Sequence, residues 1–235
     1  MIRIEGEALV VRTVDVGESD VIATFITEQV GKVGSVVRGA RKGSRRIGGA
    51  LEPIHTIAVL LEDKGAELTT LKEARIVRTR PRLVGSLEAL EAAGIALRWA
   101  RHAFPPRTPE PEGWRILTGL LDALDDPASL PRRELARAGL AMLAAVGYAL
   151  DLESCIGCGR VCPPERPACV DPARGGLVCR QCGGAATVLS PALRGAARSL
   201  ASMGAKQADE VSPEHADAVL SLVDRAMAAH AGFER

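Results

Sequence analysis

Six cysteines, all between positions 155 and 182, are the side chains of this chain best suited to chemistry. They include two C-x-x-C pairs, C-I-G-C at 155–158 and C-R-Q-C at 179–182, separated by twenty residues. This spacing is typical of a four-thiolate zinc site, because both sulfurs of each short pair can turn toward one ion. We therefore predict that zinc is bound by Cys155, Cys158, Cys179 and Cys182.

Disulfides, buried free thiols or a redox pair are the alternatives for these cysteines. The first twelve residues lack an apolar signal-peptide core and carry Glu5 and Glu7, so we expect a cytosolic protein with reduced thiols. Cys162 and Cys169 each stand alone. They are either competing ligands or small buried side chains.

Four thiolates would close the coordination shell, which indicates a structural ion rather than a catalytic one. Nucleobase deaminases also carry C-x-x-C, but with an upstream H-x-E element. None of the four histidines is followed by x-Glu; they are His55, His102, His215 and His230. We therefore predict that this protein is not an enzyme. Metal binding would stabilise a loop-rich segment, by roughly 10–16 kcal/mol in zinc-finger peptides.

Composition limits the other possibilities. The chain has 235 residues, a formal net charge of +1 and 3% aromatic residues, so any nucleic-acid surface must be local. No apolar run approaches the roughly 20 residues needed to span a membrane.

The first 80 residues resemble a small β-barrel. β-branched and apolar runs predict strands at 7–16, 21–28, 32–38, 54–61 and 66–71. Five strands in this length fit the OB-fold, a small Greek-key barrel. An SH3-like barrel fits the pattern almost as well.

A glycine-rich basic loop joins the third and fourth predicted strands. No acidic residue lies between Glu28 and Glu52. That interval contains six basic residues: Lys32, Arg38, Arg41, Lys42, Arg45 and Arg46. Such a loop can follow a phosphate backbone, although many basic runs are simply solvated.

A second basic stretch follows the fifth predicted strand and favours a nucleic-acid surface. It contains Lys72, Arg75, Arg78, Arg80 and Arg82. Phe25 is the one aromatic residue of the predicted barrel, and its place in an alternating strand indicates a core position. Without aromatic stacking, binding should be mostly phosphate contact, strongly salt-dependent and weakly sequence-specific.

Helices dominate the remainder of the chain. We expect a domain boundary near Pro81, giving a barrel domain at 1–80 and a helical domain at 81–235. Helices are predicted at 86–104, 113–124 and 131–145, and two more open at Ser190 and Ser212. The cysteine segment, 150–188, is therefore an insertion in an all-α domain.

Several motifs in this order resemble the bacterial recombination mediator family RecO. They are R-G-A-R-K-G-S at 38–44, A-L-E-P-I at 50–54, L-T-T-L-K-E-A at 68–74, M-L-A-A-V-G-Y-A-L-D-L-E-S-C-I-G-C-G at 142–159 and G-G-L-V-C-R-Q-C at 175–182. The resemblance spans nearly the whole chain.

The resemblance implies an N-terminal OB-fold and a C-terminal helical domain with a four-cysteine zinc site. It also implies binding of single- and double-stranded DNA and annealing of complementary strands, without covalent chemistry. The implied partners are RecR, the C-terminal tail of the single-strand-binding protein and, functionally, the RecA recombinase. We expect a cytoplasmic, nucleoid-associated protein.

Two sets of site residues follow. The zinc ligands are those given above, and Cys162 and Cys169 are additional to the family pattern. The candidate DNA contacts are Lys32, Arg38, Arg41, Lys42, Arg45, Arg46, Arg75 and Arg78.

Two other functions remain possible on sequence grounds. OB barrels with zinc ribbons also recognise RNA, and a preference for structured RNA over DNA would favour a translation-associated or RNA-binding factor. A redox-sensing zinc protein would change activity reversibly on oxidation of its thiols.

Overall fold

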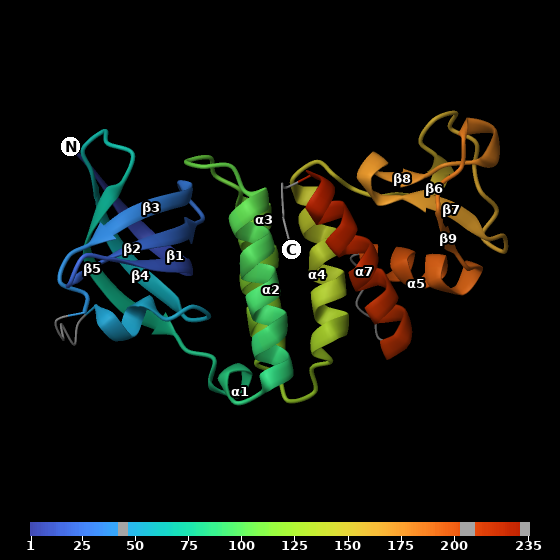
Figure 1. The fold of residues 1–235 in the computed structure, drawn as a ribbon. Helices are drawn as coiled ribbons and strands as arrows, with labels where there is room; N and C mark the ends of the chain where they lie inside the picture. Colours follow the sequence, from blue (N-terminus) through green and yellow to red (C-terminus); the bar gives the residue numbers. More distant parts are fainter. Residues whose placement is uncertain (42–46, 203–209, 231–235) are drawn as a thin grey trace. The chain divides into compact units, whose positions relative to one another are not determined.

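The computed structural model describes residues 1–41, 47–202 and 210–230, and five of its strands pair into one barrel (Figure 1). These strands are β1 (Ile2–Val16), β2 (Asp20–Thr27), β3 (Gly31–Val37), β4 (Thr56–Asp63) and β5 (Thr69–Arg78). They follow the order β1-β2-β3-β5-β4, and β4 pairs again with β1. β3 and β5 close the barrel through a short parallel seam of two residue pairs, Ser35 with Thr69 and Val36 with Thr70. The fold is the predicted OB-fold, not the SH3-like alternative.

The barrel interior follows the two-residue period of its strands. In β3, Val33, Ser35 and Val37 are buried while the intervening residues are partly exposed. Phe25 of β2 is completely buried in the same core, as its sequence position indicated. Its ring cannot stack on a nucleic-acid base in this conformation.

The fifth strand differs from the sequence prediction. β5 continues to Arg78 instead of ending at residue 71, so Lys72, Arg75 and Arg78 lie within the strand and not after it. Backbone pairing with β4 extends the strand, and Arg75 lies opposite Ala58. Most side chains in this half of β5 are exposed, so no apolar alternation marked it in the sequence.

Three helices follow the barrel, and the barrel and these helices form one compact unit, Met1–Pro127. The helices are α1 (Pro81–Val84), α2 (Leu87–Ala103) and α3 (Pro111–Leu124); a short turn, η1 (Gly48–Leu51), precedes β4. Ser86 caps α2 as predicted, because its hydroxyl oxygen accepts the backbone N–H of Ala89. The short α1 was not predicted. The expected domain limits, 1–80 and 81–235, stay a prediction.

Arg80 links the helices to the barrel through buried polar contacts. It is therefore not part of an exposed basic stretch, which corrects the sequence expectation. Its side chain is 1% exposed. It forms an ion pair with Asp122 of α3 at 2.7 Å and donates to the carbonyl of Ile54 at 2.5 Å and to the Thr56 hydroxyl at 3.2 Å. A buried guanidinium needs this number of acceptors.

The linker between α2 and α3 also docks on the barrel. Arg107 forms an ion pair with Asp63 at 2.6 Å and donates to the carbonyls of Ala66 and Glu67. Gly31 lies against the same linker at φ +68°, and a Cβ there would come within 1.8 Å of the Thr108 carbonyl oxygen. Glycine is therefore required at position 31 for both conformation and space.

In the second compact unit, Ala128–Arg235, residues 128–202 and 210–230 are described, and they form three helices and a small sheet. The helices are α4 (Pro131–Ala145), α5 (Pro191–Ala201) and α7 (Pro213–His230). The sheet has the order β6-β8-β7-β9. Its strands are β6 (Asp151–Cys155), β7 (Ala168–Asp171), β8 (Gly176–Leu177) and β9 (Thr187–Leu189), and 3₁₀ turns lie at η2 (Pro172–Arg174) and η3 (Arg180–Cys182).

In chain order the sheet comes between α4 and α5, so the cysteine segment is an insertion among helices, as predicted (Figure 1). The expectation of a loop-rich segment was incomplete, because four short strands organise it. Their lengths of two to five residues leave too little alternation for a sequence signal.

No helix among the described residues is both long enough and apolar enough to cross a membrane.

Candidate metal centre and nucleic-acid interface

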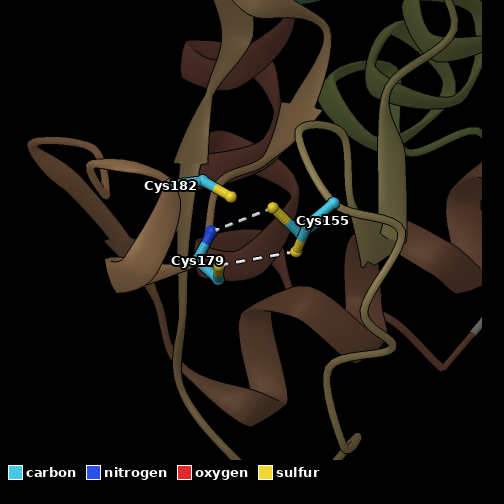
Figure 2. A group of neighbouring side chains, drawn as sticks. Cys155, Cys179 and Cys182 are labelled. Atoms are coloured by element: carbon cyan, nitrogen blue, oxygen red, sulfur yellow. Dashed lines mark hydrogen bonds between the residues drawn. The ribbon is translucent and has the colours of Figure 1, made fainter.

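The two C-x-x-C pairs meet at one point of the small sheet. Cys155 ends β6 and Cys158 follows in a turn, whereas Cys179 immediately precedes the turn η3 and Cys182 is its last residue. All four Sγ atoms lie within 4.8 Å of one another. Figure 2 shows Cys155, Cys179 and Cys182 with their sulfurs turned toward a common centre.

This geometry fits a tetrahedral metal ion with four sulfur ligands. Zn–S bonds of about 2.3 Å imply sulfur–sulfur separations of about 3.8 Å in a regular tetrahedron. The Sγ atoms of Cys158 and Cys179 are 3.8 Å apart. The structure thus gathers a donor set that can hold a metal ion, from the residues that the sequence singled out.

Glycines permit the close approach of the two pairs. Gly157 lies between the first two cysteines, and a Cβ there would be 3.2 Å from the Cys182 sulfur. Gly183, which ends η3, has φ +99°, a conformation that other residues rarely adopt.

Hydrogen bonds from backbone N–H groups favour the ionised form of one of these sulfurs. The N–H of Cys179 donates to the Cys155 Sγ at 3.3 Å, as the dashed line in Figure 2 marks. Hydrogen bonds from the N–H groups of Cys179 and Gly157 lower the pKa of the Cys155 thiol to about 6. A thiolate at neutral pH is the form that binds metal.

The neighbouring sulfurs have the opposite effect on Cys182. Hydrogen bonds with the side chains of Cys179, Cys158 and Cys155 raise the pKa of the Cys182 thiol to about 12. Ionising every thiol at so short a range accumulates negative charge, so a bound cation is needed to stabilise the full thiolate set.

The two additional cysteines lie outside this group. Cys162 Sγ accepts a hydrogen bond at 2.7 Å from Arg194, whose side chain is almost fully buried. Cys169 lies in β7, opposite Val188 of β9. Among the described residues, the four-sulfur group contains neither of them.

The structure describes part of the predicted DNA-binding loop. Arg38 is exposed just beyond β3. The backbone N–H of Arg41 donates to the Ser19 carbonyl at 3.1 Å, and its guanidinium lies 3.6 Å from the Asp15 carboxylate. The start of the loop is therefore tied to the turn between β1 and β2. Lys42, Arg45 and Arg46 lie outside the described residues.

The remaining candidate DNA contacts lie on β3 and β5. Lys32 lies six residues before Arg38 on β3, a distance of about 20 Å along an extended strand. Arg78 forms an ion pair with Asp122 at 2.9 Å. Arg75 lines a groove on the barrel.

That groove is largely acidic. It lies over β1, β4 and β5, and its ionisable lining residues are Glu5, Glu7, Glu73 and Arg75. The carboxylates oppose a phosphate backbone at this face of the barrel.

Sequence reasoning missed a group of basic side chains near Lys32. The Lys32 ammonium donates to the carbonyl of Arg101 at 2.6 Å, at the C-terminal end of α2. Three of these side chains, Arg98, Arg101 and His102, belong to α2, and Arg12 belongs to β1. They are dispersed along the sequence, so no local run of charge revealed them.

Comparison with known proteins covers both halves of the chain. The family model described as recombination protein O N terminal matches residues 1–80, and that described as recombination protein O C terminal matches residues 84–235.

Three proteins named DNA repair protein RecO illustrate the similarity. One from Anaeromyxobacter sp. (strain Fw109-5) is 36% identical over 191 residues, covering 80% of this chain and 74% of the relative. One from Anaeromyxobacter sp. (strain K) is 38% identical over 184 residues, covering 77% and 71% respectively. One from Geobacter metallireducens is 33% identical over 228 residues, covering 95% and 91%. The OB-fold barrel, the helical second half with its four-cysteine insertion, and these matches together show that the chain belongs to the RecO family of DNA repair and recombination proteins.

Proposed function

We propose that this protein is a recombination mediator that binds single- and double-stranded DNA through phosphates and anneals complementary strands. The observation that carries the proposal is the basic loop at 38–46 on an OB-fold barrel whose one aromatic side chain, Phe25, is buried. Cations without a stacking platform hold the backbone and leave the base edges free to pair.

Annealing needs this combination because two like-charged strands must approach each other. A protein that neutralises phosphates lowers the repulsion, and one that ignores base edges does so for any sequence. The mediator role requires no covalent chemistry. With RecR, the protein would help load RecA onto strands coated by the single-strand-binding protein, whose acidic C-terminal tail it would bind.

We further propose that Cys155, Cys158, Cys179 and Cys182 hold a structural zinc ion. The all-sulfur donor set favours zinc over hard cations such as Mg²⁺ or Ca²⁺, which take oxygen ligands. Four protein ligands leave no open position for a reacting water. The ion would stabilise the small sheet.

The test is a salt titration of binding to fluorescent single-stranded DNA, duplex DNA and RNA of matched sequence, with annealing measured in the same samples. The loop variant replaces Arg41, Lys42, Arg45 and Arg46 by alanine. It should flatten the log–log salt slope by about 3, since each lost phosphate contact removes about 0.7–0.9. Affinity should fall to a similar extent for all sequences.

A matched control removes four cations elsewhere, at the exposed positions Arg3, Lys64, Arg115 and Arg132. The control should bind DNA as the parent protein does. An unchanged slope in the loop variant would show that the loop is not the contact surface. A strong preference for RNA without annealing would support an RNA-binding factor instead.

A further inference from the structure

Five basic side chains from three elements of the first unit converge where α2 packs against the barrel. We call them the seam cluster: Arg12 of β1, Lys32 of β3, and Arg98, Arg101 and His102 of α2. α2 contacts β1 directly, which brings these elements together. A bulge in the pairing of β1 with β2 occurs between Val10 and Arg12, and a bulge re-aims the side chains beside it.

Two hydrogen bonds connect members of the seam cluster. The Lys32 Nζ atom donates a hydrogen bond to the Arg101 carbonyl oxygen at 2.6 Å, which holds the Lys32 ammonium group next to the backbone of Arg101. The Arg101 Nη2 atom lies 3.0 Å from the His102 Nε2 atom. A guanidinium cannot accept a hydrogen bond, so this imidazole nitrogen is the acceptor and carries no proton.

Electrostatics at the seam cluster agree with that geometry. Burial lowers the pKa of His102, and the positive charges of Arg101, Lys32, Arg98 and Arg12 lower it further. Burial and the charges of Arg12 and Arg98 likewise lower the pKa of Arg101. The positive charges that lower these two pKa values come from neighbouring members of the seam cluster and add to one another. A bound anion would relieve the repulsion.

We propose that the seam cluster binds phosphate groups of a nucleic-acid backbone, as a contact separate from the loop at 38–46. Three arginines and a lysine can each contact a phosphate oxygen, and guanidinium groups do so through two parallel N–H donors. This inference rests on the proposed function, since it assigns that function a second contact surface.

Separation of the two surfaces has a mechanical consequence. Lys32 and Arg38 lie at opposite ends of β3, about 20 Å apart along the strand. In a duplex, each strand carries one phosphate per about 3.4 Å of helix axis, so this distance along the axis spans about six of them. One backbone can therefore occupy the loop while another rests on the seam cluster, which is what annealing requires.

The experiment compares a seam variant, Arg12→Gln/Arg98→Gln/Arg101→Gln, with a control variant that loses equal charge, Arg3→Gln/Lys64→Gln/Arg115→Gln. The control positions are exposed and belong to the same unit. Binding of a fluorescent single-stranded oligonucleotide is measured across a salt titration. Loss of three phosphate contacts should flatten the slope by about 2 and weaken affinity about 100-fold at 0.1 M salt.

Two further variants separate binding from folding. Arg12→Gln/Arg98→Gln changes exposed side chains alone and should flatten the slope by more than one. The charge-conserving variant Arg12→Lys/Arg98→Lys/Arg101→Lys should keep most of the parental slope. Thermal unfolding midpoints should match that of the control variant.

Combination with the loop variant separates this inference from the proposed function. Additive losses in the salt slope would support two independent surfaces. If the seam variant binds and anneals like its control while the loop variant loses affinity, the seam inference is overturned and the proposed function stands. If the parent protein binds no DNA, both are overturned.

Discussion

Position, not residue type, separates the six thiols of this chain. Cys155 ends a strand and receives a backbone N–H from Cys179, so its thiolate is favoured and its sulfur faces three others. Cys169 lies in β7 of the same sheet, but the four-sulfur group does not include it. Identical chemistry at the two positions therefore has different consequences for metal binding.

Replacing Cys155 by serine should abolish zinc binding, whereas Cys169→Ser should retain about one ion per chain. A serine hydroxyl stays protonated and cannot complete the thiolate set. Metal analysis of the purified variants measures the stoichiometry. Retention of a full equivalent by Cys155→Ser would remove it from the ligand set, and loss of metal from Cys169→Ser would place it in the set.

A second residue-level prediction concerns Asp63. Hydrogen bonds from the Gly65 N–H and from Arg107 lower the pKa of its carboxyl group in the folded chain. The ionised form thus stabilises the fold above the ordinary pKa of 3.8, and that contribution is lost as the pH falls through the lowered value. Asp63→Asn should make stability less dependent on pH below about 4.

Urea unfolding of the first unit, followed by tryptophan fluorescence at several pH values, measures this effect. Trp99 and Trp114 both lie in that unit. Glu67→Gln, at an exposed position in the same turn, is the matched control. If the free energy of unfolding depends on pH in the same way in Asp63→Asn and in the parent protein, the Asp63 carboxylate does not stabilise the fold as proposed.

At the scale of elements, buried polar contacts decide how the helices of the first unit attach to the barrel. Arg80 connects α3 to the turn that precedes β4, through Asp122 and the Ile54 carbonyl. Ile54 has φ +90°, which is costly for a β-branched residue. The hydrogen bond from Arg80 helps to hold this conformation.

Arg80→Ala should destabilise the first unit by about 3 kcal/mol, because Asp122 loses one of its two arginine partners and the Ile54 carbonyl and Thr56 hydroxyl lose a buried donor. Lysine should rescue little, since it cannot reproduce the forked geometry. Chemical denaturation measures the free energy of unfolding. Arg82→Ala, two positions away and exposed, should change it by less than about 0.5 kcal/mol. Equal effects of the two substitutions would contradict the fastening role.

For the molecule as a whole, the division into two units separates the proposed DNA contacts from the proposed metal site. The loop and the seam cluster belong to Met1–Pro127, and the four-sulfur group belongs to Ala128–Arg235. Loss of the metal should therefore act on one unit far more than on the other.

Removal of zinc by a chelator should speed up hydrogen exchange of the backbone amides in β6–β9, while the amides of the barrel strands stay protected from exchange. Affinity for single-stranded DNA should remain within about threefold of the parental value, because the phosphate contacts lie in the first unit. Hydrogen-exchange mass spectrometry and the binding assay measure both effects. Equal loss of protection in both units would contradict their independence, and a collapse of DNA binding would place contacts in the second unit.

Local patterns in the sequence were sufficient for much of this fold. The C-x-x-C spacing identified the four sulfurs that meet, since ligands two residues apart are brought together by a single turn. β-Branched and apolar runs indicated the barrel strands, and serine caps indicated the helices that begin at Leu87, Pro191 and Pro213. Each signal depends on neighbours within a few residues, so one chain carries it without further information.

Tertiary structure alone decided which charged residues share a surface. It buried Arg80, placed Arg75 in an acidic groove and joined Lys32 to Arg101, 69 residues further along the chain. Strand pairing and helix docking set these neighbours, and both depend on contacts between residues distant in sequence. A run of basic residues in the sequence gives their charge but not the direction in which each side chain points. The fold therefore determines where the positive surfaces lie.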